Sequence, residues 1–103
     1  MIIVTTPTIT NRTIIEEKGL VTSSIVQSRN IGKDLLSGLK SIVGGELKSY
    51  TEMLEDSKKM VKERMIKEAQ SMGANGIVGF RFALTSSQGT SELIAYGTAV
   101  LMK

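Results

Sequence analysis

The sequence predicts an α+β fold, a two-layer subunit in which a mainly antiparallel sheet packs on one long helix plus one short helix. Three observations support this. Residues 1–29 are rich in Thr, Val and Ile, residues 50–72 repeat apolar side chains every three or four positions, and residues 77–102 form two strand-like runs around a polar loop. Strands, then helices, then strands are typical of the α+β class. A chain of 103 residues fits one domain, residues 1–103.

The N-terminal part is predicted to form short strands. Ile2–Val4 is expected to be the first strand, and Thr-Pro-Thr then turns the chain. Thr13–Glu17 and Leu20–Arg29 are predicted as two further strands because β-branched residues dominate both. Lys18-Gly19 is expected to be the break between them.

Two helices are predicted in the middle of the chain. Asn30 can cap a short helix whose apolar positions follow helical spacing, and Gly44-Gly45 is expected to end it. The long helix, about 50–72, is predicted to start at the capping box Ser49–Glu52, in which the Ser49 hydroxyl accepts from a backbone amide and Glu52 reaches back. Gly73 is the expected left-handed residue after its end. The apolar stripe of the long helix is predicted to be Tyr50, Met53, Leu54, Met60, Val61, Met65, Ala69 and Met72.

The C-terminal part is predicted to be a hairpin of Ile77–Thr85 and Glu92–Met102. Strict alternation of side chains gives it a small-residue face and a large-residue face. The small-residue face, with Arg81 as its one charge, suits close packing of the long helix. The large-residue face then needs another cover, either the N-terminal strands and short helix or a sister subunit, and we expect a homo-oligomer. The large-residue face is predicted to carry Val78, Phe80, Phe82, Leu84, Ile94, Tyr96, Thr98, Val100 and Met102.

Composition excludes several classes of function. The chain has no Cys and no His, which removes thiolate nucleophiles, disulfides and the commonest transition-metal ligand. The net charge is +3, but residues 46–72 mix both signs evenly and aromatic residues are only 4%, so no nucleic-acid partner is expected. No apolar run approaches the ~20 residues that span a membrane, and the N-terminus does not resemble a signal peptide. We expect a soluble, cytoplasmic protein.

Glycine-rich stretches do not match known phosphate-binding patterns. Gly44-Gly45 lacks the P-loop consensus, and Gly73, Gly76 and Gly79 are spaced G-x-x-G-x-x-G after a helix. Structural roles are expected for these glycines, with Gly79 allowing close packing. Anion binding at the helix start near Ser49 is a weaker alternative.

Candidate ligand residues are few. Carboxylates at Glu52, Glu55 and Asp56 could hold a hard cation, and helix methionines could bind a soft one, but solvation and core packing explain both sets better. If a pocket forms at a subunit seam, the residues expected to line it are Glu46, Tyr50, Arg81 and Tyr96. No catalytic residue, metal ligand or cofactor is predicted.

Three short motifs resemble a known family. They are Gly44-Gly45 with Tyr50-Thr51, then residues 73–79 (GANGIVG), then residues 95–100 (AYGTAV). In this order and over essentially the whole chain, they are similar to the YbjQ-like proteins, also called UPF0145 or DUF74. The resemblance implies a dodecin-like two-layer subunit assembled as a ring-shaped pentamer. It also brings a heavy-metal-binding label, although this chain offers neither Cys nor His.

The sequence therefore favours a non-enzymatic homo-oligomer that binds a small molecule or ion of unknown identity at its subunit seams. The first alternative is a metal-binding protein, as the family label suggests. The second is an enzyme that uses carboxylates and tyrosine without His or Cys.

Overall fold

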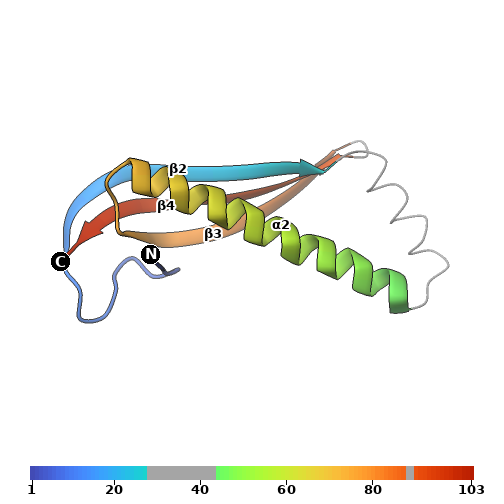
Figure 1. Cartoon of the computed structure of the whole chain (residues 1–103), viewed down its shortest axis with the longest axis horizontal. Helices are drawn as coiled ribbons and strands as arrows, with labels where there is room; N and C mark the ends of the chain where they lie inside the picture. The colour runs from blue at the N-terminus through green and yellow to red at the C-terminus, as the bar shows by residue number, and fades with distance from the viewer. Residues whose placement is uncertain (28–43, 88–89) are drawn as a thin grey trace.

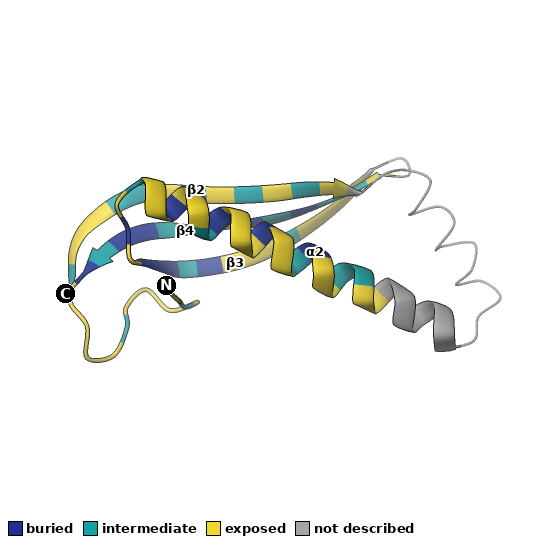
Figure 2. Cartoon of the chain, viewed as in Figure 1, coloured by how far each residue is buried: buried dark blue, intermediate teal, exposed yellow. Residues whose placement is uncertain are grey.

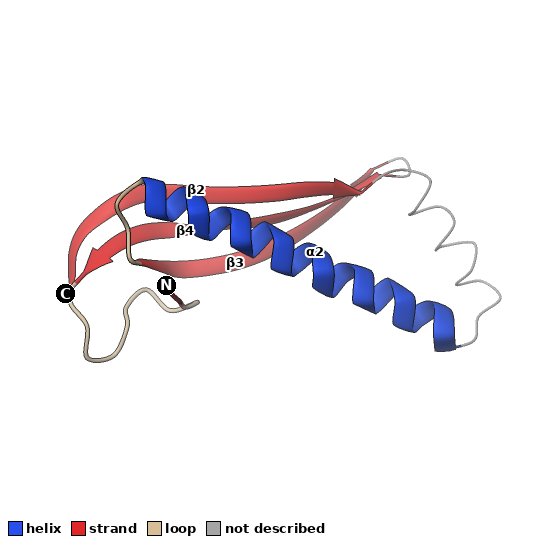
Figure 3. Ribbon diagram, viewed as in Figure 1, coloured by secondary structure: helices blue, strands red, loops and turns tan. Residues whose placement is uncertain are grey.

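A four-stranded mixed sheet and one long helix form two layers (Figures 1 and 3). The computed structural model describes residues 1–27, 44–87 and 90–103, without the side chains of 27, 44–50 and 87. The sheet order is β1-β3-β4-β2, in which β1 runs parallel to β3 and the other neighbours are antiparallel. This confirms the α+β class and the mainly antiparallel sheet. The short helix predicted after Asn30 lies outside the described residues. The strands are β1 (Ile2–Ile3), β2 (Ile14–Gln27), β3 (Gly76–Ser87) and β4 (Thr90–Met102).

Strand β2 is continuous, so the predicted break at Lys18-Gly19 is wrong. The pairing of β2 with β4 shifts register between Glu17 and Gly19, and Gly19 has a φ of 116°. A glycine tolerates this positive φ, so the irregularity bends the strand without ending it.

The long helix α2 (Gly44–Ser71) begins earlier than predicted. Gly44-Gly45 forms its first turn, so these glycines begin the long helix, whereas we expected them to end the short one. Ser49 lies inside α2 and therefore cannot cap its start. Glycine is tolerated at a helix start because the N-cap residue does not adopt helical φ and ψ, so the entropic cost of glycine inside a helix does not apply there. An anion site at a helix start near Ser49 is excluded for the same reason.

The end of α2 is as predicted. Gly73 is left-handed, with a φ of 83°. The amide of Ala74 donates to the carbonyl of Ala69 (3.0 Å), and the amide of Gly73 donates to that of Gln70 (3.0 Å). These two bonds form a Schellman motif, which satisfies carbonyls that the helix end leaves free.

The main core lies between α2 and one face of the sheet, where the helix buries a narrow stripe (Figure 2). Val61, Met65 and Ala69 are fully buried, at intervals of four residues. Ser57 continues this stripe and is buried, whereas Met60, predicted to be on it, is 42% exposed. The stripe meets β2 through Val21 and meets β3 and β4 through Ile77, Phe80, Leu93, Ala95 and Ala99.

A β-bulge in β3 makes the predicted faces of that strand wrong. Val78 pairs with Thr98 but Arg81 pairs with Tyr96, so Gly79 and Phe80 together oppose Gly97. Gly79 has a φ of 62°, and a Cβ added there would meet nothing within 4 Å, so Gly79 serves the bulge and not close packing. One extra residue reverses the alternation beyond it, because side chains have a period of two. Phe80, Phe82 and Leu84 therefore share the helix-covered face with Ala95, and Arg81 moves to the other face.

The N-terminal segment covers one end of the face opposite α2. Val4, Ile9 and Ile14 pack against a second cluster of Val78, Val100 and Met102. Backbone bonds tie the segment to β3, since the amide of Gly79 donates to the carbonyl of Thr6 (3.0 Å) and that of Phe80 donates to the carbonyl of Val4 (3.0 Å). Part of the face that we expected to need a cover is thus covered by the N-terminal segment of the same chain.

Candidate functional site

On the face of the sheet opposite α2, here called the open face, the described residues provide no cover beyond the N-terminal segment. On β2, Leu20 is 71% exposed and Val26 is 61% exposed, and their register partners on β4 are Thr98 and Glu92. On β4, Tyr96 is 41% exposed. Apolar side chains are thus exposed on two neighbouring strands of this face.

Two of the four predicted ligand residues meet on the open face. Arg81 and Tyr96 are directly opposed in the β3–β4 ladder, so their side chains share one side of the sheet. Nη1 of Arg81 donates to the carbonyls of Thr5 (2.9 Å) and Phe80 (2.8 Å). These two bonds satisfy Nη1 with backbone oxygens.

The other two predicted ligand residues belong to the helical layer. Glu46 and Tyr50 lie in the first two turns of α2, and their side chains are not among those described. Helix α2 packs on the face opposite Arg81 and Tyr96. The four-residue site therefore stays a prediction.

A pocket of about 230 Å³ opens beside the N-terminal segment on the open face. Buried Val78 and Val100 contribute apolar surface, and Thr98 contributes a hydroxyl group. Glu17 is its one ionisable lining residue, and it is exposed to solvent. The remaining lining residues are Pro7, Ile14 and Gly79.

Sequence reasoning missed this pocket. Its residues come from the N-terminal segment and three strands, which are separated by up to about ninety positions. No short motif joins them, and Pro7 and Glu17 were interpreted only as a turn residue and a strand end. A signal could have come from Gly79, because a glycine inside a strand pattern suggests a β-bulge, and both Gly79 and Pro7 line the pocket.

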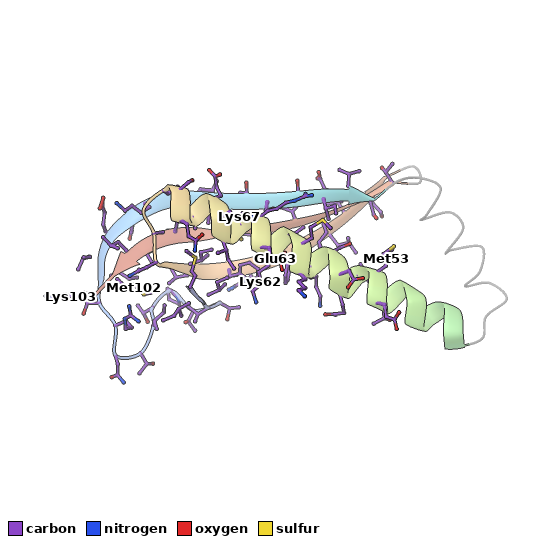
Figure 4. The ribbon with its side chains drawn as sticks, viewed as in Figure 1. Met53, Lys62, Glu63, Lys67, Met102 and Lys103 are labelled. Carbon is purple, nitrogen blue, oxygen red and sulfur yellow. The ribbon has the colours of Figure 1, made fainter. Side chains whose placement is uncertain are left out.

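Other exposed apolar side chains lie on the helix-covered side. On β3, Phe82 and Leu84 are 39% and 52% exposed. On α2, Met60 is 42% exposed and lies beside Arg64, which donates to the carbonyl of Ser24 on β2. Phe82 packs edge-on against Phe80, with centroids 4.9 Å apart, and Nζ of Lys58 lies 6.0 Å from the Phe82 ring centroid. The outer side of α2 is charged instead, with exposed Lys62, Glu63 and Lys67 (Figure 4).

The residues present do not fit a heavy-metal centre. Soft metals prefer thiolate, thioether or imidazole ligands, and the chain has only methionine among these. Met65 is sealed in the core, and the sulfur of Met60 accepts a hydrogen bond from Arg64 (3.4 Å). Among the described residues, no three Asp or Glu side chains are grouped so that they could hold a metal ion.

No helix within the described ranges is both long enough and apolar enough to cross a membrane. The fold and the pocket define a small α+β protein in which, within the described residues, a helix covers one face of a mixed sheet. Comparison with known proteins narrows this class. A family model for YbjQ-like proteins, described as "Putative heavy-metal-binding", matches residues 1–103.

Close relatives support the same assignment. The chain is 72% identical over 102 residues to a UPF0145 protein of Bacillus licheniformis, with 99% of each chain covered. It is 75% identical over 100 residues to a UPF0145 protein of Bacillus velezensis, covering 97% of this chain and 90% of that protein. The chain belongs to the UPF0145, or YbjQ-like, family, which confirms the resemblance seen in its motifs.

A solved structure shows the same fold at low identity. The crystal structure of a DUF74-family protein from Pediococcus pentosaceus has a TM-score of 0.65 to this chain at 18% identity. The match covers 100% of this chain and 98% of that one.

Proposed function

We propose that the protein is a cytoplasmic, non-enzymatic homo-oligomer, a ring of five dodecin-like subunits, whose seams bind a small molecule or ion. The observation that carries this proposal is the open face, where Leu20 and Val26 are 71% and 61% exposed on a side that α2 does not cover. Exposed apolar patches on soluble proteins often mark interfaces. Full burial of each side chain against a sister subunit would contribute about 1.5–3 kcal/mol.

The placement of the predicted ligand residues supports a site at a seam. Arg81 and Tyr96 share the open face, whereas Glu46 and Tyr50 belong to the helix on the opposite side of the sheet. A neighbouring subunit that docks its helical layer against the open face would bring the two pairs together. This arrangement explains why one chain alone does not need to assemble the site.

Native mass spectrometry tests the assembly. The wild-type protein is expected to give one species of five subunits, each of 11.1 kDa. Leu20→Arg places a charge on the open face and is expected to dissociate the ring into folded monomers, because an unpaired charge buried in an interface is strongly unfavourable. Gln70→Arg adds the same charge to an exposed position at the end of α2, about five turns away from the Glu46 and Tyr50 end that the proposed seam uses, and serves as the matched control. A wild-type protein that stays monomeric at micromolar concentration would refute the proposal.

Metal binding is the alternative that the family description suggests, and elemental analysis tests it. Because the chain has no Cys and no His and its described residues do not fit a heavy-metal centre, the purified protein is expected to retain less than one equivalent of copper or zinc per ring after dialysis. Stoichiometric copper or zinc that survives dialysis and shifts the melting temperature would favour the metal-binding function instead.

The second alternative, an enzyme that uses carboxylates and tyrosine for catalysis, has less support. The pocket on the open face supplies Glu17 as its single carboxylate, whereas a reaction such as glycoside hydrolysis needs a pair of carboxylates. Tyr96 is not among the residues that line this pocket.

A further inference from the structure

We infer that the pocket beside the N-terminal segment is a binding site for a small organic cation, a primary ammonium group on a compact apolar body. The site is built from residues of a single subunit, so it does not depend on the proposed ring or its seams. The inference rests on three features of the pocket, namely its charge, its surface and its preformed wall.

The charge of the pocket has one sign. Glu17 is the single ionisable residue in the lining, and it has no ion-pair partner among the residues that the structure describes. Lys18, next to it on β2, and Arg81, on β3, are both engaged elsewhere. Lys18 pairs with Glu16 at 2.8 Å, and Nη1 of Arg81 donates to the carbonyls of Thr5 and Phe80. The carboxylate of Glu17 is thus left to attract a cation from solution.

The surface of the pocket suits an apolar body with one polar end. Val78 and Val100 are 6% and 0% exposed, so they present a fixed apolar surface, and Ile14 adds to it. The Thr98 hydroxyl supplies a neutral acceptor for a second N–H of an ammonium group. A dry cavity of about 150 Å³ holds benzene, so a pocket of about 230 Å³ has room for a ring with a one-carbon ammonium arm.

The wall formed by the N-terminal segment is held in place before any ligand arrives. The amide of Val4 donates to the carbonyl of Ile77 (2.9 Å), and the amide of Gly79 donates to the carbonyl of Thr6 (3.0 Å). These bonds fix the backbone up to Thr6, and the Thr6 hydroxyl donates to the carbonyl of Thr8 (2.6 Å) across Pro7, whose ring also restricts its φ. A preformed wall lowers the conformational entropy that binding must otherwise lose.

Methyl and amide NMR titration of the full-length protein with benzylammonium chloride tests the site. Saturable shifts are expected at Val78, Val100 and Thr98, with a dissociation constant on the order of 1 mM, as suits a ligand of about eight heavy atoms. Benzyl alcohol and benzoate, which have similar shapes but no positive charge, are expected to bind at least about fivefold more weakly.

Two variants separate charge recognition from nonspecific binding. Glu17→Gln keeps the shape of the side chain and is expected to weaken benzylammonium binding about fivefold, an effect that should shrink at high salt. Glu63→Gln is the matched control, because it removes the same charge from an exposed position on the outer side of α2 that does not line the pocket. Thr98→Val, which is nearly isosteric, is expected to weaken binding about twofold to threefold.

Three results would overturn the inference. They are the absence of saturable shifts at the pocket residues, equal affinity for benzyl alcohol, and an equal loss of affinity in the Glu63→Gln and Glu17→Gln variants. Because the titration reports on residues within one subunit, a monomeric protein that binds benzylammonium would support this site while refuting the proposed ring.

Discussion

Met65→Ala is expected to lower the free energy of unfolding by about 2–5 kcal/mol. Met65 is fully buried and lies in the middle of the α2 stripe that meets the sheet. Truncation removes apolar surface from the core and leaves a cavity that the rigid sheet beneath it cannot collapse to fill. Chemical denaturation at a fixed subunit concentration gives the value, since oligomerisation makes apparent stability depend on concentration.

Met60→Ala is the matched control for this experiment. Met60 lies on the same helix and loses the same atoms, but it is 42% exposed, so the expected loss is about 0.5 kcal/mol or less. Equal losses in the two variants would mean that α2 does not pack through the stripe described above.

Gly97→Ala is expected to cost about 1–3 kcal/mol because β3 crowds this position. A Cβ on Gly97 would lie 2.8 Å from Cγ2 of Ile77 and 3.1 Å from the carbonyl oxygen of Val78. Both obstacles belong to the strand that carries the bulge opposite Gly97, and the backbone there is also tied to the N-terminal segment. The strand cannot retreat without breaking those bonds. Thermal unfolding of the variant measures the effect.

Gly76→Ala provides the comparison, because it makes the same chemical change in the same strand pair. Its Cβ would meet chiefly the terminal methyl group of Met102, the end of a flexible side chain that can change rotamer. We expect a loss of less than about 1 kcal/mol. Both variants gain equally from a less flexible unfolded chain, so the difference between them isolates the steric effect. A Gly97→Ala protein as stable as the Gly76→Ala protein would contradict the proposed crowding.

Local patterns were enough to identify most of the secondary structure. The apolar spacing of residues 50–72 predicted the long helix, and Gly73 predicted its end, because helix period and a left-handed terminus are properties of neighbouring residues. The C-terminal hairpin was predicted from two β-rich runs around a polar loop. The start of α2 was missed because glycine is a weak signal at a helix N-terminus, where it is tolerated.

The assignment of side chains to faces could not be completed from the same patterns. Alternation was correct for β4, where Ala95 and Ala99 face α2, but it failed on β3 beyond Gly79. A bulge depends on pairing with another strand, here opposite Gly97, and on the bond from Gly79 to Thr6 far away in the chain. The candidate site was affected in the same way, since Arg81 changed faces with the bulge.

The sequence by itself determined the α+β class, the family, the helix end at Gly73 and the exclusion of thiol and imidazole chemistry, because composition and short-range periodicity carry that information. The tertiary structure alone decided that Arg81 lies opposite Tyr96 on the open face, and that Glu17 and Thr98 meet Pro7 around one pocket. These placements follow from strand register and from hydrogen bonds between distant segments. Neither of these produces a periodic pattern in the amino-acid sequence, so they could not be predicted from it.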